Sequence, residues 1–280
     1  MRNSLLDGIP KESDYRLLLE SKEFKDLERL SNHFLSVNKK NLEGYAKKWV
    51  EDPLHQWSRQ WEYPFVFSRI QPILETKGTA KILDAGSGVT FFPYYIKSQY
   101  DYADIYCNDY DTSLEGIFHR INANGDNKIK FSCSDLRELR YENGIFDVIY
   151  CISVLEHTDD YVEIIEGFNR ILKPSGRLII TFDISLDGKH DISVEKGTAL
   201  LKSLTEQFDY DKDISLDIRS YVSMPGIFTT LTANNINANL LPWKYPTLIY
   251  RIRSLIAGKG FCSWPPPLTV FCLGLTKRST

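Results

Sequence analysis

The sequence predicts an α/β protein built on one open, mostly parallel sheet, and three features carry this prediction. From residue 81 onward, short apolar runs alternate with segments of helical spacing. The runs are as apolar as strands that are buried on both faces. A Gly-x-Gly turn follows the first run. Alternating strands and helices favour right-handed βαβ crossovers, and therefore a parallel sheet.

Each expected element can be read along the chain. The runs expected to be buried strands are KILDAG, DIYCND, IKFSCSD, FDVIYCI and GRLIITFDI. The segments expected to be helices between them are FFPYYIKSQY, TSLEGIFHRINAN and DDYVEIIEGFNRILK. The last of these helices is expected to stop at Lys173-Pro174-Ser175-Gly176, because proline and glycine end a helix and open a tight turn. The final run, LTVFCLGLTKRST, is expected to be a closing strand.

The chain is expected to divide into three regions of one domain. Residues 1–75 predict a helical cap rich in aromatic side chains, residues 76–184 the core sheet, and residues 185–280 an insertion followed by closing strands. The tryptophans of the cap suit either core packing between helices or a lid over a ligand pocket. In the insertion, TALLKSLTEQF predicts a helix, MPGIFTTLTANN a strand or loop edge, and YPTLIYRIRSLIAG an amphipathic helix.

Composition narrows the class of protein. The chain has 280 residues, 42% of them apolar and 25% charged, with a formal net charge of −3. This balance gives no basic surface for nucleic acid. No signal peptide and no apolar stretch of about 20 residues is present, so we expect a cytoplasmic protein. The five cysteines form no CxxC pair, which favours buried thiols over a disulfide framework or a metal site.

The turn after the first strand is the first candidate binding element. Gly86 and Gly88 allow the backbone to approach a ligand closely, and the following helix offers free N–H groups. The dinucleotide pattern G-x-G-x-x-G would need a third glycine where Phe91 stands. Asp84, just before the turn, could face a cationic ligand. A plain tight turn between strand and helix explains the same residues.

Two further acids follow strands. Asp109 ends the second run, 21 residues after Gly88. In a parallel sheet this position lies beside the glycine turn, where a carboxylate can accept two ribose hydroxyls; a solvated acid at a strand end is the alternative. Asp135, with the Leu136 N–H, could bind the amino edge of adenine, or Asp135 could cap a helical turn.

Five segments together resemble a known family. LDAGSG, the acid of CNDYD, SCSDL, FDVIYCISVLEH and RILKPSGRLIITF are similar in order and spacing to the motifs of class I S-adenosylmethionine-dependent methyltransferases. They look like the small-molecule branch, whose members often carry a similar L-E-H. The resemblance covers about residues 78–184. It implies a Rossmann-like, seven-stranded, mostly parallel sheet with helices on both faces and an antiparallel last strand near an edge.

The resemblance also implies a cofactor, S-adenosyl-L-methionine, with S-adenosyl-L-homocysteine as product. By the same resemblance, Gly86 and Gly88 border the methionine part of the cofactor, and Asp109 holds its ribose. Asp135 holds the adenine amine, and Ser153 to Leu155 flank the sulfonium. The cap and the insertion would cover the site and recognise the acceptor.

Candidates for chemistry can be chosen from the residues themselves. His157 is the first candidate for a general base, because an imidazole titrates near neutral pH and this one follows a strand's carboxyl end. A packing or hydrogen-bonding role explains it as well. Asp183 and His190 are further candidates. Arg59 and Tyr63, in the aromatic segment, could reach the methionine carboxylate from the cap.

The expected function is methyl transfer to a small molecule, with a hydroxyl of a sugar, glycan or secondary metabolite favoured because aromatic faces stack on such rings. The alternatives are a non-catalytic Rossmann-like binding module, an NAD-dependent enzyme, and a methyltransferase acting on a lipid-linked acceptor at a membrane surface. The membrane reading rests on YPTLIYRIRSLIAG with Lys244, Arg251 and Arg253, and a buried surface helix explains the same pattern. Acceptor atom, oligomeric state and pathway stay open.

Overall fold

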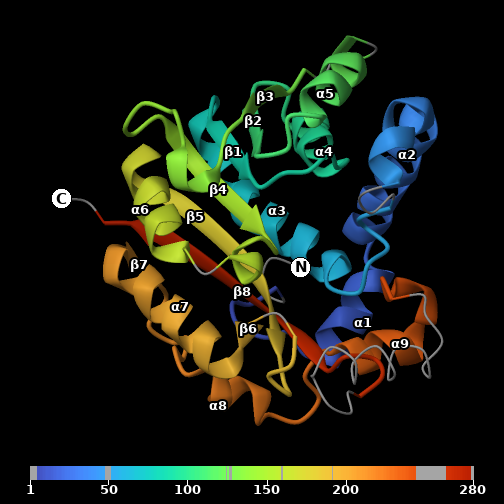
Figure 1. The fold of residues 1–280 in the computed structure, drawn as a ribbon, viewed down its shortest axis with the longest axis vertical. Coiled ribbons are helices and arrows are strands. Elements are labelled where there is room, and N and C mark those ends of the chain that lie inside the picture. The colour runs from blue at the N-terminus through green and yellow to red at the C-terminus, as the bar shows by residue number, and fades with distance from the viewer. Residues whose placement is uncertain are drawn as a thin grey trace.

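A computed structural model describes residues 5–47, 52–123, 125, 128–158, 160–190, 192–243 and 263–278. These residues form one mixed sheet flanked by helices (Figure 1). Its strands are β1 (Lys81–Ala85), β2 (Asp104–Asp109), β3 (Lys130–Cys133), β4 (Phe146–Ile152), β5 (Leu172–Ser185), β6 (Ile192–Ser193), β7 (Phe208–Asp209) and β8 (Leu268–Lys277).

The strand order is β3-β2-β1-β4-β5-β8-β7, with β6 paired to β5 off this path. Strands β1 to β5 run parallel, whereas β8 lies antiparallel between β5 and β7. The prediction of a mostly parallel sheet closed by an antiparallel strand is therefore confirmed. This order places the carboxyl ends of β1, β2, β4 and β5 at one edge, where ligands of open α/β sheets bind.

The helices form two layers. Their bounds are α1 (Glu12–Glu20), α2 (Lys22–Ala46), α3 (Arg59–Lys77), α4 (Phe92–Gln99), α5 (Leu114–Ala123), α6 (Tyr161–Ile171), α7 (Val194–Gln207), α8 (Ile218–Val222) and α9 (Thr230–Ile236). Short 3₁₀ turns are η1 (Leu136–Glu138), η2 (Leu155–His157) and η3 (Ala238–Leu240). None of the helices in these described ranges is both long and apolar enough to cross a bilayer.

Two hydrophobic cores cover the two faces of the sheet. Neighbouring residues of a strand alternate between them: Ile82 belongs to the core that includes residues of α2 to α5, and Leu83 to the core that includes residues of α6 and α7. In β4, Tyr150 and Cys151 divide in the same way. This alternation follows from the two-residue repeat of a strand, and it explains why the runs are apolar throughout.

The N-terminal cap is helical, as expected, but its first stretch is broken at Ser21. The Ser21 hydroxyl accepts a hydrogen bond from the Phe24 N–H, so Ser21 caps α2 and separates it from α1. Trp57 and Trp61 are 2% and 1% exposed. Both therefore lie in the core between cap and sheet, which agrees with packing rather than with an open lid.

Two sequence expectations were wrong: that β3 is fully buried, and that Cys133 is a buried thiol. Strand β3 is at the edge of the sheet and only partly buried, and Cys133 at its end is exposed, whereas Cys107, Cys151 and Cys272 are buried. A strand at the edge has a neighbour on one side only, so an apolar run does not ensure burial there. Cys262 lies outside the described residues.

The insertion contains a helix where a strand or loop edge was expected. MPGIFTTLTANN includes α9, whose N-terminus is capped by the Thr229 hydroxyl, an acceptor for the Thr232 N–H. Threonine favours strands by its branching, but at this position its side chain stabilises a helix start instead. The TALLKSLTEQF helix is confirmed as α7, and the segment YPTLIYRIRSLIAG lies outside the described residues.

Candidate active site

The turn between β1 and α4 has the conformation that its glycines predict. Gly86 and Gly88 have φ angles of +75° and +51°, in the left-handed region that glycine adopts without a steric penalty. A Cβ atom on Gly86 would stand 2.6 Å from Cγ2 of Val154. The backbone of this turn is therefore packed directly against the segment that follows β4.

Asp84 lies beneath this turn and is 5% exposed. Burial raises the pKa of its carboxyl to about 8; the Asp109 charge acts in the same direction, and the Tyr150 hydroxyl opposes it. At neutral pH the Asp84 carboxyl is therefore largely protonated. A cation beside it would favour the charged form.

Asp109 lies beside the glycine turn, where the sequence placed it. Its Oδ2 accepts a hydrogen bond from the Gly88 N–H at 2.9 Å, and its Oδ1 accepts one from the Asp111 N–H at 3.0 Å. The N–H groups of Gly86 and Ser87 both donate to the Asn108 carbonyl. The ends of β1 and β2 are thus joined through the turn, with one carboxylate fixed at its centre.

Asp135 caps the helical turn η1, one of the two roles that the sequence allowed. Its carboxylate accepts from the Arg137 N–H at 2.9 Å at the start of η1 and forms an ion pair with the Arg137 guanidinium. The hydrogen bond from the Arg137 side chain lowers the pKa of Asp135. Leu136 begins η1. Both residues follow β3, at the same edge of the sheet as Asp109.

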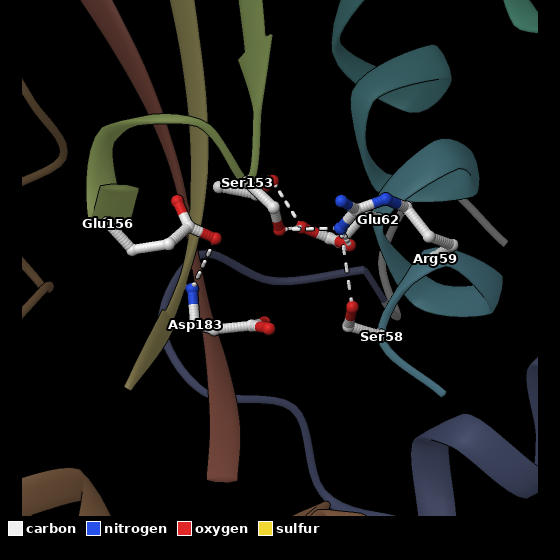
Figure 2. A network of polar contacts seen from close by, with 7 residues as sticks. Ser58, Arg59, Glu62, Ser153, Glu156 and Asp183 are labelled. Carbon is white, nitrogen blue, oxygen red and sulfur yellow. Dashed lines mark hydrogen bonds and ion pairs between the residues drawn. The ribbon is translucent and has the colours of Figure 1, made fainter. Parts of the chain in front are cut away.

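A buried polar network joins the cap to the end of β4 and to residues within β5 (Figure 2). Its centre is Glu62 of α3, which is fully buried. The Glu62 carboxylate accepts hydrogen bonds from Ser153 Oγ at 2.7 Å, Thr181 Oγ1 at 2.5 Å and Arg59 Nη1 at 2.5 Å. Sequence reasoning missed Glu62 and Thr181; the available signal for Glu62 was a carboxylate three residues after an arginine and between two aromatic residues.

Arg59 is bound through one nitrogen. Its Nη1 donates to Glu62, to Ser153 Oγ at 2.5 Å and to Ser58 Oγ at 3.4 Å. Within the described residues, no hydrogen bond is made by its Nε or Nη2, and the side chain is 21% exposed. That edge of a guanidinium matches a carboxylate in two parallel hydrogen bonds.

Ser153 ends β4 in a strained conformation. Its φ angle is +47°, which is uncommon for a residue with a Cβ atom. Its N–H donates to the Thr181 carbonyl, and its hydroxyl lies between Glu62 and Arg59. Such a conformation persists where the surroundings fix it from several sides, and it sits where the resemblance places the sulfonium.

Glu156 and His157 follow in η2, and their side chains differ in exposure. Glu156 is 8% exposed, and its Oε1 accepts from the Asp183 N–H at 3.2 Å. Burial raises the pKa of the Glu156 carboxyl to about 8. His157 is exposed. Glu156, and not the expected base His157, is therefore the residue with a hydrogen bond to β5. His190 lies further along the chain, with its Nδ1 3.7 Å from Asp187 Oδ1.

Parts of this chain are similar to known methyltransferases. Residues 83–180 match the family model described as "Methyltransferase domain". A wheat phosphoethanolamine N-methyltransferase is 28% identical over 113 residues, which are 39% of this chain and 21% of that protein. A 27-O-demethylrifamycin SV methyltransferase of Amycolatopsis mediterranei is 27% identical over 106 residues, 35% of this chain and 39% of that protein. This chain thus spans well under half the length of these relatives.

A solved structure extends the likeness beyond the core. The crystal structure of the [4+2]-cyclase SpnF superposes with a TM-score of 0.53 over 89% of this chain and 95% of that one, at 15% identity. This is a likeness of fold. The strand order and the glycine turn define a Rossmann-like α/β domain. Residues 83–180 of this domain are similar to methyltransferase domains.

Proposed function

We propose that this protein transfers a methyl group from S-adenosylmethionine to a hydroxyl of a small molecule, a sugar, glycan or secondary-metabolite ring. One observation carries the proposal. Asp84, Asp109 and the Arg59 network gather at the carboxyl edge of β1, β2, β4 and β5, around a glycine turn without the third glycine of dinucleotide sites. The part of the chain that matches the methyltransferase domain model includes Asp84, Asp109 and Ser153.

The residues present fit the cofactor. Its cationic amino acid end suits Asp84, a buried carboxyl that gains its charge most easily next to a cation. Its carboxylate suits the Nε and Nη2 edge of Arg59. Asp109 would hold the ribose, and Asp135 with the Leu136 N–H the adenine. When bound, S-adenosylmethionine supplies a methyl group on a sulfonium.

The chain's own contribution is mainly to bind and to orient. Asp109 is fixed by two backbone N–H groups, and Ser153 by three partners, so little reorganisation is needed when a ligand arrives. Tyr63, which is buried, and Val154, which is partly buried against Gly86, limit the access of water to the turn. His157 would accept the proton of the acceptor hydroxyl, because it follows β4 in η2, four residues after Ser153.

The names of the relatives bear on the acceptor. The rifamycin relative's name describes an oxygen of a secondary metabolite, whereas the wheat relative's name describes an amine nitrogen. We favour the oxygen, since a hydroxyl requires a base and the chain offers His157 for that role.

A second candidate is a ligand-binding protein that performs no methyl transfer. It is favoured by the fold neighbour SpnF, which is titled a [4+2]-cyclase rather than a methyltransferase. A lipid-linked acceptor at a membrane surface is a further variant; the residues that suggested it lie outside the described ranges.

The test is methyl transfer itself. The purified protein is incubated with methyl-labelled S-adenosylmethionine and separate panels of glycans, polyketide-like alcohols and primary amines. Label in an alcohol, with an equal amount of S-adenosylhomocysteine, supports the proposal. Label only in amines would overturn the hydroxyl assignment, and cofactor binding without transfer to any panel would favour the second candidate.

A further inference from the structure

Glu62 has a position that the cofactor fold by itself does not require. It belongs to the cap helix α3, yet its carboxylate accepts from Ser153 after β4 and from Thr181 within β5. Its third partner, Arg59, lies one turn earlier on the same helix. Three elements therefore meet at one fully buried carboxylate.

We propose that Glu62 is a positioning residue that sets Arg59 and Ser153 for the amino acid end of the cofactor; this role rests on the proposed function. Glu62 holds only Nη1 of Arg59, so the Nε and Nη2 edge stays turned away from it (Figure 2). The same carboxylate holds the hydroxyl of Ser153, whose left-handed backbone lies at the exit of β4.

Charge explains why a carboxylate is needed. A guanidinium that is largely withdrawn from water is costly unless an opposite charge and hydrogen bonds accompany it. Glu62 supplies both from beneath, while Ser58 and Ser153 supply neutral acceptors. An amide at position 62 keeps the shape and an acceptor for Ser153, but it loses the charge that fixes Arg59.

The first experiment compares two ligands by calorimetry. S-adenosylhomocysteine carries the amino acid end, and 5′-methylthioadenosine lacks it while keeping the adenosine. Glu62→Gln should weaken binding of S-adenosylhomocysteine at least tenfold and change binding of methylthioadenosine less than twofold. Equal losses for both ligands would show a general structural role, and no loss for either would show no role; each result overturns the proposal.

A matched control exists on the same helix. Arg69, seven residues beyond Glu62, pairs with Asp7 at 3.3 Å, and Asp7 also accepts from the Gly274 N–H. Asp7→Asn removes a comparable carboxylate–arginine pair far along α3 from the glycine turn. It should lower the melting temperature without changing the ratio of the two affinities.

A double variant tests whether Glu62 acts through Arg59. If it does, Arg59→Ala with Glu62→Gln should bind S-adenosylhomocysteine no more weakly than Arg59→Ala alone. Fully additive losses would contradict this route. Should Glu62→Gln fail to fold, Ser153→Ala, which removes one of its partners, should lower the same affinity ratio severalfold, and an unchanged ratio would count against the proposal. Wild-type protein that binds neither ligand would instead overturn the proposed function.

Discussion

The hydroxyl of Tyr45 lies 2.6 Å from the point where a Cβ atom on Gly88 would stand. The same hydroxyl accepts a hydrogen bond from the Val89 N–H at 3.1 Å. Tyr45 is near the end of α2, so the cap touches the glycine turn directly. Burial raises the pKa of Tyr45, which keeps this hydroxyl protonated.

This contact predicts how Gly88 responds to substitution. Gly88→Ala should lower the free energy of unfolding by about 2 kcal/mol, because a side chain at φ +51° is strained and its Cβ meets the Tyr45 hydroxyl. In a Tyr45→Phe background the loss should be smaller, since the ring carbon lies 3.7 Å away. Gly78→Ala, at φ +73° with open space around it, isolates the backbone strain. Denaturant unfolding of Gly88→Ala, Tyr45→Phe, the double variant and Gly78→Ala measures these free energies. If Gly88→Ala lost the same free energy of unfolding in the wild-type and Tyr45→Phe backgrounds, the contact would be refuted.

Asp84 predicts proton release on cofactor binding. Its pKa of about 8 leaves the carboxyl mostly protonated at pH 7, and a cationic ligand beside it favours ionisation. Binding of S-adenosylmethionine at pH 7 should therefore release up to about one proton. Calorimetry in buffers of different ionisation enthalpy reports that number. Asp84→Asn should show no buffer dependence, and the same release from wild type and variant would exclude Asp84 as the source.

His55 predicts a pH-dependent link within the cap. Its Nδ1 lies 2.6 Å from Asp52 Oδ2 and its Nε2 lies 3.0 Å from Glu28 Oε1, which ties the segment before α3 to α2. The hydrogen bond to Asp52, helped by the one to Glu28 and opposed by partial burial, raises the pKa of His55 to about 9.

The sign follows from this raised pKa. The stabilisation from His55 is fully present below the pKa of the imidazole in the unfolded chain, near 6.5, and is lost as pH rises through its folded pKa of about 9. Because about a third of the side chain is exposed, we expect on the order of 1 kcal/mol after solvent screening. Between pH 6 and 10, the free energy of unfolding should fall more steeply with pH for wild type than for His55→Gln. Parallel curves would contradict the prediction.

His157 is tested by its effect on rate. His157→Ala should lower turnover about 10²-fold, because a hydroxyl acceptor loses its base. Cofactor affinity should stay similar, since the imidazole is exposed. His119→Ala, on the exposed face of α5, serves as the matched control and should leave both quantities unchanged. Unchanged turnover in His157→Ala would remove His157 from the chemistry.

The sheet could be predicted because its central strands are buried on both faces, so KILDAG and FDVIYCI are apolar apart from charged residues near their ends. The place of Asp109 beside Gly88 followed from the common edge of neighbouring parallel strands. The edge position of β3 was harder to see, because the apolar pattern of a strand does not report how many neighbours it has.

Glu62 could not be found by the same reasoning. Charged side chains are mostly exposed, and an acid in a helix reads as surface unless its partners are known. Those partners, Ser153 and Thr181, stand 91 and 119 positions away in the sequence. The cap of α9 by Thr229 was missed for a related reason: side-chain hydrogen bonding decided the local structure over branching propensity.

The central claim is that this edge of the sheet binds S-adenosylmethionine, and direct calorimetry tests it. We expect micromolar binding of S-adenosylmethionine and S-adenosylhomocysteine by the wild-type protein, loss of both in Asp109→Ala, and no binding of NAD. Wild-type protein that binds neither sulfur ligand, or that binds NAD in their place, would contradict it.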